Sequence, residues 1–242
     1  MKAHIFKKHG EFNSVNPCAA YLGFRERGYD ISFFGDEGPD VAGLTSDTVV
    51  VGGVPWIHRV LRQMGRPVPT LDAVPLTLAP WAGRRTWQAT LGEVRQRVDA
   101  GQPVFLKPAP DQTKAFAGHV ARHYGDLAIT AGLPADLMVS CAEPLDMRAE
   151  YRVFLCHGEI LGCKHYHGDF RLTPDFAAID AAVSAYTDAP AGCSLDFAVT
   201  ADGKPVLIEV NDGYALGAYG LNPMLYAGLL AARWHEMTVQ DA

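Results

Sequence analysis

Asp196, Glu209 and Asn211 are the residues whose types and spacing best suit them to hold a metal ion. They lie in two segments of alternating apolar and polar residues, and Asp202 with Gly203 between them predicts a β-hairpin with a type I′ turn. Such a turn sets Asp196 directly opposite Glu209, with Cβ atoms roughly 5 Å apart. Two carboxylates at that distance repel, and a divalent cation such as Mg²⁺, which prefers oxygen ligands, would relieve the repulsion. The alternative is a solvated polar face on an ordinary hairpin.

Two lysines could bind phosphate. Lys107 closes an apolar segment, 103–107, that predicts a strand, and Lys114 follows seven positions later. A lysine at a strand end presents a compact positive charge that suits phosphate oxygens. The alternative for Lys107 is a surface lysine whose stem covers apolar atoms while its ammonium reaches water.

A second charged block starts at Glu150. Residues 150–155 alternate, so Glu150 and Arg152 share one face of a predicted strand. A turn at residues 157 and 158 leads into a second strand that ends at Lys164, and Arg171 follows in a Gly-Asp-Phe-Arg sequence. The simplest interpretation of Arg152 is an ion pair with Glu150, and the alternative is a phosphate contact.

His165 and His167 form a His-x-His pair directly after this predicted strand. On a regular strand both side chains face the same side, which would allow a transition-metal site. The sequence offers no third ligand nearby, so a substrate contact or a pair of surface histidines is the preferred interpretation.

Together these blocks resemble the ATP-grasp enzymes, in which an Asp and a later Glu-x-Asn at a strand end hold the metal. The resemblance implies that Asp196, Glu209 and Asn211 bind Mg²⁺, with Mn²⁺ as a substitute, and that the metal bridges the phosphates of ATP. It also implies that Lys107 contacts the α- and β-phosphates and that Lys114 belongs to a loop covering the nucleotide.

The same resemblance assigns the remaining nucleotide contacts. Segment 137–140 matches the hinge between the lobes, so Ser140, Cys141 and Ala142 would meet the adenine edge through backbone groups. Glu143 would reach the ribose, although the family usually has its glutamate earlier in the hinge. Glu150 is grouped with these nucleotide-binding residues.

The block from Glu150 to Arg171 resembles, more narrowly, the ATP-grasp ligases that add glutamate to the C-terminus of a ribosomal protein. Carried over, Arg152 and Lys164 would face the γ-phosphate or an acyl-phosphate, and Arg171 would face the substrate. The segment between Lys164 and Gly168 is shorter here than in those ligases.

The elements that would position these residues predict an α/β (α+β) fold. The resemblance implies an ATP-grasp fold of two α+β lobes gripping the nucleotide (78–140 and 141–242), preceded by a small α/β pre-ATP-grasp domain (1–77). Prolines in 65–83 suggest a linker. Asn16 is the expected N-cap of the first helix. Other predicted strands are 2–6, 31–34 and 48–51, and the predicted helices are 17–27, 55–64, 86–100, 174–186 and 222–234.

Composition limits the function classes. The net charge of −6 argues against a general nucleic-acid surface, and no apolar run is long enough to cross a membrane. The N-terminal residues lack the apolar core of a secretory signal, and five cysteines without a Cys-x-x-Cys pair predict reduced thiols and a cytoplasmic protein. A homodimer is the expectation only because it is the commonest assembly.

The resemblance implies an ATP- and Mg²⁺-dependent ligase that joins a carboxylate to an amine through an acyl-phosphate and releases ADP and phosphate. Its partners would be a small-molecule or peptide carboxylate and an amine acceptor. Two alternatives stay open: a kinase that phosphorylates its substrate without ligation, and a nucleotide-binding module without turnover.

Overall fold

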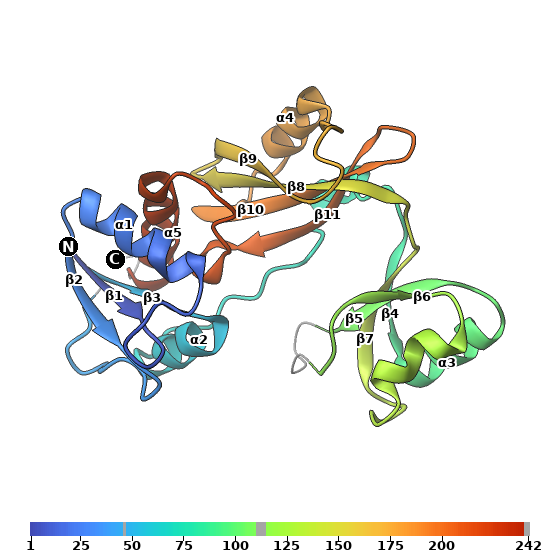
Figure 1. Cartoon of the computed structure of the whole chain (residues 1–242), viewed down its shortest axis with the longest axis horizontal. Coiled ribbons are helices and arrows are strands. Elements are labelled where there is room, and N and C mark those ends of the chain that lie inside the picture. Colours follow the sequence, from blue (N-terminus) through green and yellow to red (C-terminus); the bar gives the residue numbers. More distant parts are fainter. Residues whose placement is uncertain (46, 110–114, 240–242) are drawn as a thin grey trace. The chain divides into compact units, whose positions relative to one another are not determined.

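The computed structural model (Figure 1) describes residues 1–45, 47–109 and 115–239 and divides into two compact units. Unit 1 combines Met1–Trp81 with Met147–Ala242, and unit 2 is the continuous segment Ala82–Asp146. The predicted domain boundaries after residues 77 and 140 divide the chain differently and stay a prediction. Within the described part, every helix is too short or too polar to cross a lipid bilayer.

The N-terminal part of unit 1 is a parallel three-stranded sheet in the order β2-β1-β3. Its strands and helices are β1 (Lys2–Phe6), α1 (Val15–Glu26), β2 (Asp30–Phe34), β3 (Thr48–Val51) and α2 (Val54–Gln63). These elements confirm the predicted ones to within two residues. The predicted N-cap is wrong, because α1 begins at Val15 after Ser14. Asn16 instead accepts a hydrogen bond from the backbone N–H of Ala218, 3.0 Å away.

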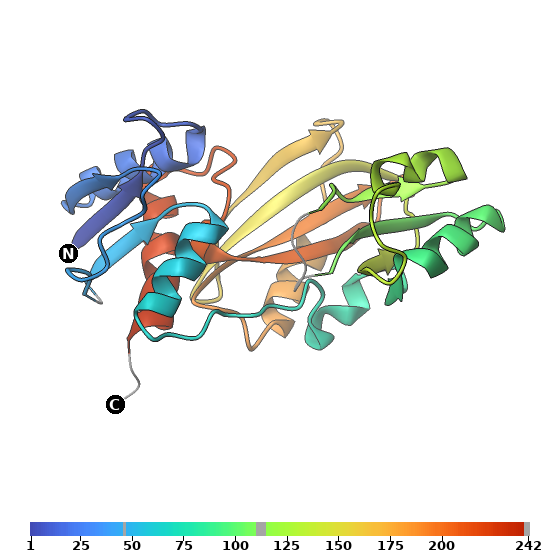
Figure 2. The same ribbon diagram turned by 90° about the horizontal axis from the view of Figure 1, so that it is seen from below.

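The C-terminal part of unit 1 is an antiparallel sheet in the order β11-β10-β8-β9. Its elements are β8 (Met147–Cys156), β9 (Glu159–Gly168), α4 (Phe176–Ala185), β10 (Gly192–Thr200), β11 (Pro205–Asp212) and α5 (Pro223–Thr238). One face, through Val153 and Leu195, packs on α4. The other face, through Phe154, joins a core shared with α5 and the N-terminal sheet. Helix α5, drawn in red, contacts both β3 and β10 (Figure 2).

The two hairpins of this sheet turn differently. His157 and Gly158 both have positive φ, 51° and 78°, as a two-residue type I′ turn requires. Between β10 and β11 the type I′ prediction is wrong: the Thr200 N–H bonds to the Lys204 carbonyl, and only Gly203 has positive φ, at 79°. A left-handed Asp202 would cost roughly 1–2 kcal/mol, and a three-residue loop avoids that cost. This loop shifts the register by one residue, and a bulge between Asp196 and Phe197 shifts it back.

Unit 2 is a second antiparallel sheet in the order β4-β7-β5-β6, with α3 (Leu91–Asp99) packed on it. Its strands are β4 (Thr86–Thr90), β5 (Val104–Pro108), β6 (His119–Ala121) and β7 (Met138–Ala142). The predicted helix 86–100 is wrong in its first five residues, which form β4. Thr90 accepts a hydrogen bond from the Glu93 N–H, and the Glu93 carboxylate accepts one from the Thr90 N–H. This capping box starts the helix at Leu91, five residues later than predicted.

Candidate active site

A row of four charged residues crosses the C-terminal sheet of unit 1. Lys164 on β9 lies opposite Arg152 on β8, Arg152 lies opposite Asp196 on β10, and Asp196 lies opposite Glu209 on β11. Directly opposed residues share a face, so all four side chains belong to the face that Phe154 also occupies. The predicted pairing of Asp196 with Glu209 is confirmed. The sheet therefore lines up two cations and then two carboxylates on neighbouring strands.

Arg152 and Asp196 form a buried ion pair at the centre of this row. The guanidinium donates from Nε to Oδ1 at 2.8 Å and from Nη2 to Oδ2 at 2.7 Å, and the two residues are 7% and 3% exposed. Asn211 donates a third hydrogen bond to Oδ2 at 3.1 Å. The partner of Arg152 is thus Asp196, and the simpler interpretation of a pair with Glu150 is wrong.

The electrostatics of the pair follow from its burial. Burial raises the pKa of Asp196, and Glu209 acts in the same direction, whereas hydrogen bonds from Arg152 and Asn211 oppose the shift. Burial alone would lower the pKa of Arg152, but its hydrogen bonds to Asp196 outweigh that effect and raise it. Each partner of the pair therefore depends on the other for its charge inside the protein.

Two tyrosines complete the surroundings of Arg152. The guanidinium lies 4.6 Å from the centre of the Tyr219 ring and 6.0 Å from that of Tyr166, and the two rings are 5.1 Å apart. Burial, the nearby carboxylates of Asp196 and Glu150 and a hydrogen bond with Glu150 raise the pKa of Tyr166. Neither tyrosine was predicted as a site residue. The only signal for Tyr219 is its place in a glycine-rich segment directly after the hairpin that carries Asp196.

The donor set of Asp196, Glu209 and Asn211 fits Mg²⁺. Two carboxylates in direct register and a side-chain amide on one sheet face supply the oxygen ligands that this ion prefers. The Asn211 amide lies 3.1 Å from Asp196, so these side chains converge. Within the described residues no group of three or more His, Cys, Asp or Glu side chains is arranged for a metal. Any metal held on this face would therefore depend on the mixed carboxylate–amide set.

The two histidines of β9 do not share a face. A bulge sets His165 opposite Tyr151 and His167 opposite Glu150, and neighbouring residues of β8 point to opposite sides. The expectation that both histidines face the same side is therefore wrong, and the pair cannot chelate one metal ion.

Arg171 lies outside the charged row, in the loop after β9. Its guanidinium donates two hydrogen bonds to Asp169, at 2.8 and 2.9 Å, and its side chain is 77% exposed. The structure thus shows a surface ion pair at Arg171, and its role toward a substrate stays a prediction.

Apart from Glu150 on β8, whose role toward ATP stays a prediction, the remaining nucleotide-binding candidates belong to unit 2. Lys107 on β5 lies opposite Ser140 on β7, so the two share a face, while Cys141 points into the core and burial raises its pKa to about 11. Glu143 bonds the backbone N–H of Arg85 at 3.0 Å, which ties the end of β7 to the start of β4. The roles of Lys107, Ser140, Cys141, Ala142 and Glu143 toward ATP stay predictions. Lys114 lies outside the described residues.

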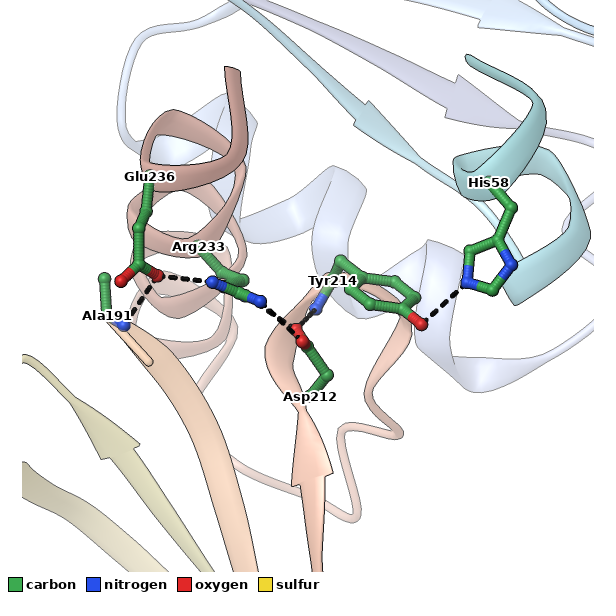
Figure 3. A network of polar contacts seen from close by, with 6 residues as sticks. All are labelled: His58, Ala191, Asp212, Tyr214, Arg233 and Glu236. Atoms are coloured by element: carbon green, nitrogen blue, oxygen red, sulfur yellow. Dashed lines mark hydrogen bonds and ion pairs between the residues drawn. The ribbon is translucent and has the colours of Figure 1, made fainter. Parts of the chain in front are cut away.

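A polar network fastens the end of β11, directly after Asn211 (Figure 3). Asp212 accepts two hydrogen bonds from Arg233 on α5, at 2.7 and 2.6 Å, and Arg233 also bonds Glu236 at 2.6 Å. Two residues further, the Tyr214 hydroxyl lies 2.8 Å from His58 Nε2 on α2. These contacts hold the strand end that carries Asn211 against two helices. This network was not predicted from the sequence.

A comparison with protein-family models identifies the chain. Residues 81–229, more than half of its length, match the model described as ATP-grasp domain, R2K clade family 2. The chain is an ATP-grasp protein. The predicted family and the predicted ATP-grasp fold of helices and sheets are thereby confirmed. No curated protein matches this ATP-grasp chain significantly in sequence.

Solved structures agree on the fold of this ATP-grasp protein. A RimK domain protein ATP-grasp from Sphaerobacter thermophilus DSM 20745 superposes with a TM-score of 0.64 at 16% identity, covering 99% of this chain and all of that one. D-cycloserine synthetase DcsG gives a TM-score of 0.56 at 15% identity, covering 97% and 100%. D-alanine–D-alanine ligase from Bacillus anthracis gives 0.55 at 13% identity, covering 98% and 96%. At these identities the likeness shows the fold alone.

Proposed function

We propose that this ATP-grasp protein is an ATP- and Mg²⁺-dependent ligase that joins a carboxylate to an amine and releases ADP and phosphate. The observation that carries the proposal is the charged row. It places Lys164 and Arg152 beside Asp196 and Glu209 on one sheet face. Cations that can meet phosphate oxygens and carboxylates that can hold a metal are the parts that phosphoryl transfer needs.

Each residue of the row, together with Asn211 and Arg171, has a proposed task. Asp196, Glu209 and Asn211 hold the metal, which when bound offsets the negative charge of the nucleotide phosphates. Arg152 and Lys164 neutralise the charge that develops on the transferred phosphoryl group. Arg171 contacts the substrate from the loop after β9.

We propose that unit 2 contributes the other nucleotide contacts. Lys107 binds the α- and β-phosphates, as a lysine at a strand end can. Backbone groups of Ser140, Cys141 and Ala142 meet the adenine edge. Glu143 binds the ribose, for which its carboxylate would have to exchange the Arg85 N–H for a ribose hydroxyl.

The proposed reaction has two steps. A carboxylate oxygen of the first substrate forms a bond to the γ-phosphorus, and the bond to the β,γ-bridging oxygen breaks, so that ADP leaves. The amine nitrogen of the second substrate then attacks the acyl carbon, phosphate leaves with the C–O bond electrons, and the amine loses a proton. Two fold neighbours, D-alanine–D-alanine ligase and the ATP-grasp ligase PsnB in complex with a minimal precursor, suggest a substrate class. We therefore propose an amino acid or peptide carboxylate and an amine acceptor.

A coupled ADP-release assay against pooled amino acids and peptides, followed by mass spectrometry of the products, tests this function. The expected result is ADP formation that needs both an acid and an amine, together with a product lighter by one water than its two substrates. Glu209→Gln should lower the rate on the order of 10²-fold or more. The matched control is Asp180→Asn, which removes an exposed carboxylate on α4, outside the charged row, and should retain activity.

The alternatives give different results in the same assay. A phosphorylated product that persists without an amine would identify a kinase. Magnesium-dependent ATP binding with no ADP formed across the pools would identify a nucleotide-binding module. Either result would overturn the ligase proposal.

A further inference from the structure

The guanidinium of Arg152 is held from two sides. Asp196 accepts from its Nε and Nη2 atoms, and the Tyr219 ring lies 4.6 Å from its central carbon. A cation over a tyrosine ring is attracted by the ring's quadrupole, and more strongly where water is excluded. Arg152 is 7% exposed, so the ring acts on a largely desolvated cation.

The backbone holds Tyr219 in place over Arg152. Tyr219 has φ +42°, a left-handed conformation that tyrosine rarely adopts. The residues on either side are fastened: the Ala218 N–H bonds to Asn16, and Leu216 and Leu221 are buried in the core. Such an outlier persists only where its surroundings determine it, and it points to a function for the side chain that it aims.

Gly217 leaves room for the Tyr219 ring. A Cβ atom at Gly217 would lie 2.9 Å from Tyr219 Cε2 and 3.6 Å from Arg152 Nη1. Any side chain at this position would therefore crowd the ring and force it to shift. The loop thus has a tyrosine, Tyr219, at a strained backbone position and a glycine, Gly217, where the tyrosine ring needs space.

The hold on Arg152 affects whether Asp196 binds the guanidinium or a divalent cation. Both of its carboxylate oxygens accept from Arg152, and Oδ2 also accepts from Asn211. A divalent cation on the same carboxylate would compete with the guanidinium, because two cations this close to each other repel.

We propose that Tyr219 is a positioning residue that holds Arg152 on Asp196 and thereby lowers the affinity of this face for divalent cations. When the guanidinium is released, Asp196 can bind the metal and Arg152 can contact the phosphoryl group beside Lys164. The inference rests on the proposed metal role of Asp196. It predicts the unusual result that removing a side chain beside the site tightens metal binding.

Mn²⁺ titration followed by electron paramagnetic resonance, without nucleotide and without turnover, tests this inference. Tyr219→Ala should bind Mn²⁺ about 2- to 30-fold more tightly than the unchanged protein, the factor by which loss of a cation–π contact favours the released guanidinium. Tyr219→Phe keeps the ring and should stay within about 2-fold. Both variants keep a non-glycine residue at positive φ, so the backbone strain cancels in the comparison.

Two further variants complete the test. Gly217→Ala should tighten Mn²⁺ binding in the same direction as Tyr219→Ala, because its Cβ displaces the ring while Tyr219 itself is present. Asp196→Asn should abolish the site. Near-ultraviolet circular dichroism checks that each variant is folded, and Tyr219 is exposed enough, at 46%, that truncation leaves no core cavity.

The outcomes separate the two proposals. Equal or weaker Mn²⁺ binding by Tyr219→Ala, with the site lost in Asp196→Asn, overturns the positioning role and leaves the ligase proposal intact. Unchanged Mn²⁺ binding by Asp196→Asn removes the metal role of Asp196 and the inference with it. Tighter binding by both Tyr219→Ala and Gly217→Ala, with Tyr219→Phe unchanged, supports the inference.

Discussion

Arg152→Met should destabilise the protein severely, because it leaves the Asp196 carboxylate buried without a cation. Asp196 is 3% exposed and would keep only the Asn211 hydrogen bond. Removing one partner of a buried ion pair typically costs about 3–5 kcal/mol, and the two charge-assisted hydrogen bonds lost here are consistent with that range. Methionine fills a similar volume, so the loss reports the charge more than a cavity.

Urea unfolding in a chelating buffer measures this loss without a divalent cation that could replace the guanidinium. The slope of the unfolding free energy against urea should be the same in both proteins, so that the midpoint shift reports stability. The matched control is Arg171→Met. It breaks a bidentate pair of nearly the same geometry with Asp169, but at a solvent-exposed site, and should change stability far less.

A double variant sharpens the argument. Replacing a buried ion pair by apolar side chains is often neutral or stabilising, so adding Asp196→Leu to Arg152→Met should recover most of the lost stability. The reasoning would be refuted if Arg152→Met cost no more than Arg171→Met, or if the double variant were less stable than Arg152→Met alone.

Three further predictions use other parts of the chain, each checked by urea unfolding. Gly203→Ala should lower the free energy of unfolding by about 1 kcal/mol, because Gly203 has positive φ, and open space around it rules out a clash. The control Gly132→Ala, also in open space, should lower it less. Equal losses would contradict the turn assignment. Thr90→Ala should cost about 1 kcal/mol by removing the capping box, and no loss would contradict that role. Burial and Arg62 lower the pKa of His58, so stability should fall as the pH drops below about 6.5, and an unchanged slope in His58→Gln would contradict this cause.

Local periodicity predicted the hairpin that carries Asp196 and Glu209, because alternation identifies which residues share a strand face. It did not predict the turn correctly, because an Asp202–Gly203 sequence is compatible with both a two-residue and a three-residue loop. The pairing of Asp196 with Glu209 was nevertheless right because the bulge next to Asp196 cancels the shift that the longer loop introduces. A sequence pattern gives the face of a residue well and the register near a turn poorly.

The partners of charged side chains were predicted least well, because they depend on the order of strands in the sheet. Arg152 meets Asp196 only because β8 lies beside β10, and no local pattern encodes that neighbour. Asp212 meets Arg233 because α5 packs beside the sheet, which no local pattern encodes either. The family resemblance named Arg152 and Asp196 as site residues but did not show that they bind each other.

The division of the chain into two units bears on how the protein is made. Ile5 near the first residues and Trp234 near the last belong to one hydrophobic core, whereas the fully buried residues described in the core of unit 2 lie between residues 91 and 141. Domains fold as units while the ribosome adds residues. Unit 2 can therefore fold while synthesis is still under way. The strands that precede unit 2 complete their hydrophobic core only after α5 has been synthesised.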